Sequence, residues 1–253
     1  GYLSLPCFND LHHVRPGRRG HLLIAVTGLD LVVEVSLEGE VTRRWSVLED
    51  EEPFQRFDES VDYRRVATTK PHRSHPNFLV EHQGEVWVSR FEQRDAISLS
   101  DPRRRIAIGQ ERPHDGLNRS RRAYFSTVDG HLVLADLETA AVERVVDLNA
   151  IDGRGLALGW CRGVRPLTDD LVLVGFSRLR PSRFRENLRW VKHRLGQRAT
   201  AGDLPTRIVL YDLAAERQCW QFNLEDHGLN ALFSIHLQDH DDIPEGSRGP
   251  HGI

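Results

Sequence analysis

Short apolar or alternating segments, separated by Gly, Asp and Pro, follow one another along almost the whole chain of 253 residues. They are rich in Val, Ile, Leu, Tyr and Phe, which favour strands, and helical periodicity is nearly absent. Eleven segments are predicted as strands, at residues 21–27, 31–37, 40–47, 85–91, 95–99, 123–128, 131–137, 142–148, 171–176, 207–213 and 218–224. The pattern predicts an all-β fold: a sandwich, a barrel or a propeller.

Internal repetition favours the propeller. A polar head followed by a strand, a turn and a second strand begins at His13, His75, His114 and Cys161, and each head precedes the middle of its first strong strand by 10 or 11 residues. A fifth head begins at His227. Four strands in a repeat of about 40 to 50 residues are typical of propeller blades. We therefore predict one β-propeller domain over residues 1–253 with five blades, to whose closure residues 1–8 could add one strand.

One segment of the sequence is similar to the blades of known propellers. HPNFLVEHQGEVWVSRFEQRDAISL, residues 75–99, contains a G-x-h-W-V strand and a strand ending in I-x-L, and it resembles the blades of NHL-type and gluconolactonase-like propellers. Residues 71–77 (P-H-x-x-H-P-N) and 112–116 (R-P-H-D-G) are similar to the heads of uncharacterised bacterial propellers. The resemblance implies the fold of residues 10–237 and leaves the activity open. Gluconolactonase-like enzymes hold a divalent cation with Glu, Asn and Asp, whereas this chain has His at its heads.

Histidines at equivalent heads indicate a site on the propeller axis. The first strand of each blade would begin at one mouth of the central channel, so the heads converge although they are distant in sequence. Neutral imidazoles are preferred ligands of iron, copper and zinc, whereas calcium and magnesium prefer carboxylates. We predict a transition-metal ion, one of these three, held by His13, His75, His114 and His227, with Cys161 as a further candidate.

Further residues near the heads are candidates for chemistry. Asp115 and Asp226, each beside a head histidine, are predicted to orient the imidazoles, and His72 and Asp115 are predicted as catalytic acid–base groups. Two alternatives stay open: the histidines hydrogen-bond turns and neighbouring strands, or they act as acids and bases without a metal. Cys161 can equally be a small buried hydrophobic residue.

An insertion at about residues 177–204 is the one predicted helix. Phe184, Leu188, Val191 and Leu195 recur at helical spacing after Ser182, a possible N-cap. Seven Arg, one Lys and one Glu between residues 178 and 198 make this segment strongly basic. It would attract an anionic substrate, positioned by Arg183, Arg185 and Arg189, or it would form a solvated basic face. Residues 239–253 are predicted to be a polar tail.

Composition narrows the function classes. The net charge of −3, three widely spaced cysteines and the lack of a run of about 18 apolar residues argue against nucleic-acid binding, a disulfide framework and a membrane span, and the expected location is cytoplasmic. No P-loop, G-x-S-x-G or H-E-x-x-H motif is present. The leading hypothesis is a metal-dependent enzyme for a small anionic molecule, with redox or oxygen chemistry preferred over zinc hydrolysis. The alternatives are a non-catalytic binding or scaffold propeller, and a lactonase-like hydrolase that uses a hard cation.

Overall fold

The computed structural model describes residues 1–179 and 204–237, which form four antiparallel sheets of four strands each. The first two sheets contain β1 (Leu11–Pro16), β2 (Leu22–Val26), β3 (Leu31–Val35) and β4 (Val41–Ser46), then β5 (Pro76–His82), β6 (Glu85–Arg90), β7 (Asp95–Ser98) and β8 (Arg105–Ala107). The other two contain β9 (Pro113–Arg119), β10 (Arg122–Thr127), β11 (His131–Asp136) and β12 (Ala141–Asp147), then β13 (Trp160–Pro166), β14 (Leu171–Ser177), β15 (Arg207–Asp212) and β16 (Arg217–Asn223). One short helix, α1 (Leu148–Asp152), precedes the last sheet.

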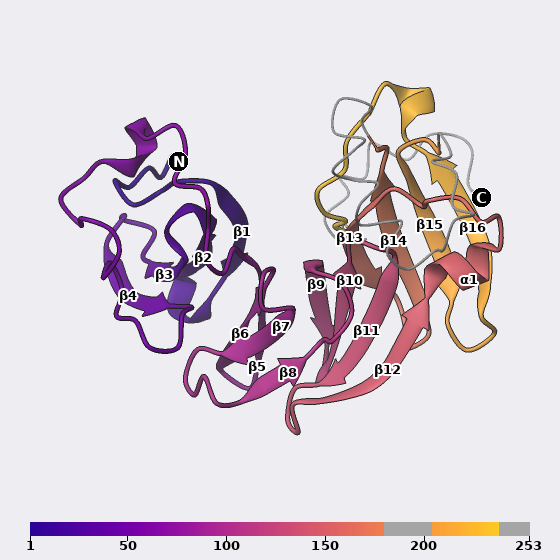
Figure 1. Cartoon of the computed structure of the whole chain (residues 1–253), viewed down its shortest axis with the longest axis horizontal. Helices are drawn as coiled ribbons and strands as arrows, with labels where there is room; N and C mark the ends of the chain where they lie inside the picture. The colour runs from indigo at the N-terminus through magenta and orange to yellow at the C-terminus, as the bar shows by residue number, and fades with distance from the viewer. Residues whose placement is uncertain (180–203, 238–253) are drawn as a thin grey trace, which may run out of the picture.

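Every sheet is a simple meander in which consecutive strands pair. The sheets follow one another around an arc (Figure 1), and the first strand of each, β1, β5, β9 or β13, lies beside the first strand of the next. We call these four the inner strands. Four consecutive meander sheets with their first strands around a common axis are the β-propeller architecture, which confirms the predicted all-β class.

All eleven predicted strands are present, with ends that shift by two residues or fewer. The strands that sequence reasoning missed are β8 and the four inner strands. The inner strands fall on the polar heads, where Pro, Gly, His and Arg interrupt the apolar pattern, so their strand propensity is low. The axis itself is therefore built from the segments that look least like strands.

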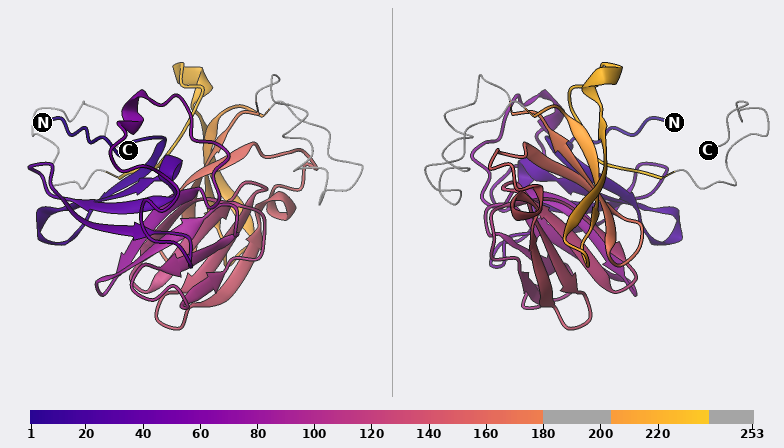
Figure 2. Two further views of the ribbon diagram at one scale, coloured as in Figure 1. Left: turned by 60° about the vertical axis from the view of Figure 1, so that its left-hand side comes forward. Right: turned by 90° about the vertical axis from the view of Figure 1, so that its right-hand side faces the viewer.

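The described residues contain four sheets, where five blades were predicted. The fifth head forms a 3-10 turn at Glu225–His227 and then continues to residue 237 without strand pairing. Figure 2 shows this segment, in yellow, running back from the turn toward the first sheet. Residues 1–8 form no strand either, so the predicted closing strand is wrong for this part of the chain.

The hydrophobic core lies between neighbouring sheets. One cluster joins the first two sheets around Val32 and Leu79, a second joins the next pair around Trp87 and Phe125, and a third joins the last pair around Tyr124. A fourth cluster covers the free face of the first sheet with residues from the N-terminal segment and from the connection to β5: Leu3, Leu5, Cys7, Phe8, Phe54, Phe57, Tyr63 and Val66. Each sheet is thus stabilised by the apolar side chains of a neighbouring sheet or segment that pack on its faces.

The segment after β16 is seated on the last sheet by one leucine. A Cβ atom on Gly175 or Gly163 would lie 2.2 or 2.8 Å from Cδ2 of Leu232, so only glycines leave room for this side chain. Ser177 Oγ donates to the Leu232 carbonyl at 3.1 Å and accepts from the Leu232 N–H at 3.0 Å. These contacts fix where the following residues, Phe233 to His236, lie.

Two predicted features fall outside the described residues. The basic helix, with Arg183, Arg185 and Arg189, belongs to residues 180–203, and the polar tail belongs to residues 238–253. Within the described part of the chain, no helix has the length and hydrophobicity needed to cross a bilayer.

Replacing Leu232 by Ala is expected to lower the free energy of unfolding by about 2–5 kcal/mol, because the substitution leaves a cavity over the two glycines. Chemical denaturation measures this change. Leu237→Ala is the control, since Leu237 is 46% exposed and its truncation should cost little. Equal effects of the two substitutions would show that Leu232 does not hold the segment on the sheet.

Candidate functional site

All four inner strands are irregular at the same place, near their first residues. The pairing register with the second strand shifts between Leu11 and His13 in β1, and at the corresponding points of β5, β9 and β13. A bulge redirects the side chains of the extra residues, and such bulges are frequent beside functional sites. The first residue inside each interruption is His12, Asn77, His114 or Arg162, and we call these four residues the bulge ring.

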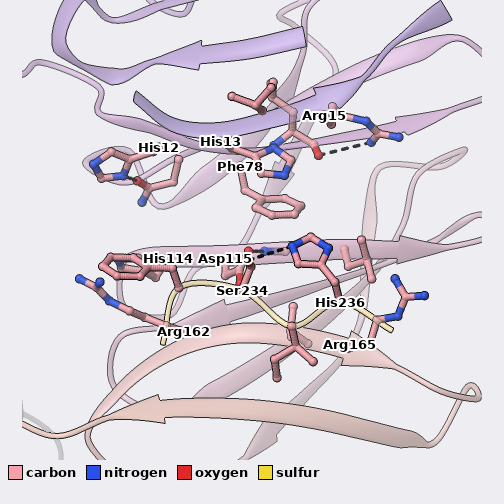
Figure 3. A pocket seen from close by; sticks show the side chains of 18 of the residues that line it. His12, His13, Arg15, Phe78, His114, Asp115, Arg162, Arg165, Ser234 and His236 are labelled. Atoms are coloured by element: carbon pink, nitrogen blue, oxygen red, sulfur yellow. Dashed lines mark hydrogen bonds between the residues drawn. The ribbon is translucent and has the colours of Figure 1, made fainter. Parts of the chain in front are cut away.

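The bulge ring lines one end of a cavity of about 590 Å³ on the axis. The four inner strands and the segment from Phe233 to His236 form its walls. Figure 3 shows side chains from both sides of the axis, among them His13 and Phe78 facing Asp115 and His236 across the cavity. The volume is in the range of pockets that bind small molecules.

One hydrogen bond joins two members of the bulge ring, and a second fastens Asn77 to the next inner strand. His12 Nδ1 lies 2.6 Å from Asn77 Oδ1, and Asn77 Nδ2 donates to the Pro113 carbonyl at 2.9 Å. The rings of His12 and His114 are 6.4 Å apart between centroids. His114 Nδ1 is buried and has no hydrogen-bond partner among the described residues. A ligand at this end would meet a fixed amide and the imidazole of His114, both of which line the cavity.

A second group of imidazoles adjoins the ring. The Nδ1 atoms of His72 and His75 are 3.0 Å apart, and the His75 ring meets the His12 ring edge-on at 4.6 Å. Asp10 lies 3.5 Å from His12 Nε2 and 3.8 Å from His72 Nε2. A hydrogen bond from His12 lowers the pKa of Asp10 to about 2, and burial lowers that of His75 to about 3. At neutral pH this group therefore contains an ionised Asp10 and a neutral His75.

The position of His75 is set by a buried carboxylate on the first sheet. Asp30 accepts the backbone N–H groups of Arg73, Ser74 and His75 at 2.8 to 3.0 Å, and Arg56 Nη1 donates to it at 2.7 Å. His75 itself has a positive φ of 58°, an uncommon conformation for a residue with a side chain. The turn before β5 is thus held rigidly enough to aim His72 and His75.

His13 and Asp115, at one register position of β1 and β9, hold the next inner strand. His13 Nδ1 accepts the Leu79 N–H at 3.2 Å, and its ring stacks on Phe78 at 3.8 Å. Burial, with further contributions from Arg15 and His236, lowers the pKa of His13 to about 3. His13 is therefore a neutral hydrogen-bond acceptor whose Nδ1 is already occupied, as the structural alternative predicted.

The pKa of the Asp115 carboxyl is shifted upward, whereas that of His13 is shifted downward. Burial raises the pKa of Asp115 to about 7, although the backbone N–H groups of Gly116, Gly163 and Val164 lower it in part. Gly163 and Val164 belong to β13, so Asp115 links β9 to its neighbour. Predicted as a catalytic acid–base group, it lines the cavity with an ionisation poised near neutral pH, but its hydrogen bonds are those of a residue that fastens two strands.

Arginines occupy the other end of the cavity. Arg15 and Arg165 stand three residues after the bulge-ring residues of β1 and β13, and Figure 3 shows them at the end opposite to His12, His114 and Arg162. Among the described residues, the hydrogen bonds of Arg15 are two long contacts, to the Pro16 and Leu79 carbonyls, both at 3.4 Å. Arg165 Nε is buried and has no hydrogen-bond partner in the described parts of the chain.

The structure does not bring the four predicted metal ligands together. His75 and His114 both lie near His12, but His13 is engaged with the second sheet, and His227 is exposed and stacks on Phe222 of the outer strand β16 at 4.8 Å. Asp226 is likewise exposed on the outer turn.

Cys161 and the other possible ligands also differ from the predicted metal centre. Cys161 is fully buried among apolar side chains, which raises its thiol pKa, so it is the small hydrophobic residue of the alternative interpretation. Within residues 1–179 and 204–237, no group of three or more His, Cys, Asp or Glu has the geometry to hold a metal ion. The residues that the structure describes therefore do not form the predicted metal centre.

Sequence reasoning missed the cationic side of the site. Arg15, Arg162 and Arg165 were not singled out, and the heads of the different blades were aligned one to three residues out of register. The alignment in the structure matches LHHVR of β1 with CRGVR of β13, so Arg15 and Arg165 are equivalent. That shared Val-Arg pair was the signal available in the sequence.

Ionisation of Asp115 makes stability depend on pH. Its pKa is near 4 in the unfolded chain and about 7 in the folded one, so the folded state binds more protons between these values, and stability falls as the pH rises through this window. Asp115→Asn should remove this dependence, which is on the order of 4 kcal/mol for such a shift. Denaturation at a series of pH values measures it. Asp226→Asn, at an exposed carboxylate, should retain the wild-type slope, and an unchanged slope in Asp115→Asn would contradict the assignment.

No protein-family model matches the sequence, and no curated protein is similar to it. Among solved structures, the chain is similar to a protein of unknown function from Bacteroides caccae (16% identity, TM-score 0.54, 84% of this chain and 66% of that one). It is also similar to the Cps50 (Swd1) β-propeller domain of Myceliophteria thermophila (13%, 0.48, 84% and 55%) and to a chain of a mitotic checkpoint complex (8%, 0.49, 85% and 53%). The chain spans about two thirds of the first structure and about half of the others. The likeness concerns the fold alone, and the NHL-type or gluconolactonase-like resemblance stays a prediction.

Proposed function

We propose that this protein binds a small organic anion in the cavity on the propeller axis. The observation that carries the proposal is the pair Arg15 and Arg165, two guanidinium groups on one cavity with no carboxylate within ion-pair distance among the described residues. Guanidinium groups remain charged at neutral pH, and their planar donors fit carboxylate and phosphate oxygens.

The surroundings of Arg15 support this interpretation. Burial lowers the pKa of its guanidinium, and Glu81 acts in the opposite direction, but the carboxylate of Glu81 is already bound by Arg18 at 3.1 Å. A half-buried cation without its own counter-ion is costly to the folded protein. An anionic ligand would supply the missing charge and gain affinity from the low dielectric of the cavity.

The histidines would contribute hydrogen bonds and no charge. Burial holds the pKa of His114 well below its usual value and that of His13 at about 3, so both rings are neutral at pH 7. Anion recognition would therefore depend on the arginines, and the imidazoles would select the shape and polarity of the rest of the ligand.

Binding replaces metal-dependent chemistry as our leading proposal. The predicted ligands His13 and His227 are engaged elsewhere. Among the predicted site histidines in the described residues, His72 and His75 are the pair whose ring nitrogens lie as close together, at 3.0 Å, as two ligands of one ion. The non-catalytic binding propeller among the alternatives agrees better with these contacts. A transition metal, redox chemistry and a cytoplasmic location remain predictions from the sequence.

The proposal is tested by titrating the protein with citrate in an isothermal calorimeter. Arg15→Leu and Arg165→Leu should each weaken citrate binding by about 10- to 100-fold, because a hydrogen bond to a charged group is worth about 1.5–3 kcal/mol. Added salt should also weaken binding to the wild type.

Arg103→Leu is the matched control, since the Arg103 side chain is 91% exposed and pairs with Asp101 away from the cavity. Its affinity should equal that of the wild type. If all three substitutions have the same effect on citrate binding, the cavity is not an anion site of the proposed kind.

A further inference from the structure

We infer that the ligand is a phosphate monoester of a polyhydroxylated molecule, such as a sugar phosphate, with its phosphate between Arg15 and Arg165 and its hydroxyls on the bulge ring. This inference rests on the proposed function and adds the chemical class and the orientation of the ligand. It comes from the unequal chemistry of the two ends of the cavity (Figure 3).

The arginine end matches a doubly charged group. Two guanidinium groups contribute a charge of +2, and a phosphate monoester carries a charge of about −1.5 to −2 at neutral pH, with three oxygens that accept hydrogen bonds. A carboxylate would balance only one of the two cations. Both arginines line the cavity, Arg15 from β1 and Arg165 from β13.

The bulge-ring end disfavours a second anionic group. Asp10 lines the cavity here, and its pKa of about 2 keeps it ionised at neutral pH. Its carboxylate would repel another anion, and Arg162, whose guanidinium lies 5.2 Å from the centre of the Phe233 ring, only offsets that charge. The two ends therefore differ in net charge.

The same end offers partners that suit hydroxyl groups. A hydroxyl both donates and accepts hydrogen bonds, and so do neutral imidazole and carboxamide groups. His12 and Asn77 are fixed by their mutual contact of 2.6 Å, and the buried His114 Nδ1 has no partner within the described parts of the chain. The imidazole of His114 lines the same end of the cavity and is neutral at pH 7, so it adds a further hydrogen-bonding group for a ligand hydroxyl.

The distance between the ends fits a short carbon chain. Arg162 and Arg165 are three residues apart on β13, which corresponds to about 10 Å in an extended strand. Between the ends the cavity wall includes Phe78, Leu79 and Val164, which present carbon atoms to the ligand skeleton. A phosphorylated chain or ring of about five carbons would reach from one end to the other.

Calorimetry with three probes tests this inference: ribose 5-phosphate, n-pentyl phosphate, which has the same anion without hydroxyls, and ribose, which has no anion. Wild-type protein should bind ribose 5-phosphate at least tenfold more tightly than n-pentyl phosphate, and ribose only weakly. His114→Leu should reduce ribose 5-phosphate to the affinity of n-pentyl phosphate and leave n-pentyl phosphate unchanged. Arg165→Leu should weaken both phosphates.

A second variant tests the orientation. Asp10→Asn removes the repulsive carboxylate, so it should bind pentane-1,5-diyl bisphosphate several-fold more tightly than the wild type does, with no change for n-pentyl phosphate. Melting temperatures of the variants that equal that of the wild type would show that all of them are folded.

The outcomes separate the two proposals. Equal affinities of ribose 5-phosphate and n-pentyl phosphate in the wild type, or a preference for ribose 5-phosphate that survives His114→Leu, would overturn the inference and leave anion binding in place. Failure of both phosphates and of citrate to bind would overturn the proposed function as well.

Discussion

The structure depends on the burial of sheet faces against one another. Successive residues of β2 alternate between two clusters: Leu23 and Ala25 pack toward the second sheet, and Ile24 and Val26 pack under the N-terminal segment. A strand buried on both faces needs a covering layer on each side, which the first sheet cannot provide alone. Stacking the sheets around an arc satisfies this requirement and brings the inner strands together at the axis.

Polar residues at the axis link the inner strands to one another and also line the cavity. His13 accepts the Leu79 N–H, Asn77 donates to the Pro113 carbonyl, and Asp115 accepts N–H groups of β13, so each links one inner strand to the next. The same side chains line the cavity. A repeated polar head is therefore explained by strand-to-strand fastening even before any ligand is considered, which is why the histidines alone could not identify a metal site.

Strand periodicity made the outer strands predictable, whereas the bulges prevented prediction of which inner-strand residues lie at the same level. The sequence placed His13, His114 and Cys161 at one level, whereas in the structure His13 is level with Asp115, and Cys161 is level with Leu11. An extra residue in each inner strand shifts every later side chain by one position, and alignment on residue type cannot detect such a shift. The fifth head differs from the others: after its 3-10 turn the segment packs Leu232 against two glycines of the last sheet, and its described residues form no strand.

Burial at the axis also determines which groups set the charge of the cavity. It lowers the pKa values of His13, His75 and His114 so far that their rings stay neutral near pH 7, while Asp10 stays ionised. Guanidinium groups carry a positive charge at this pH, so Arg15 and Arg165 supply the cations. The charge of the cavity is thus fixed by arginines and one carboxylate, which stand at opposite ends. A cavity with separated charges and neutral hydrogen-bonding groups can distinguish the two ends of a ligand, and this property follows from packing: the sheet faces that exclude water from the core also desolvate the imidazoles beside it.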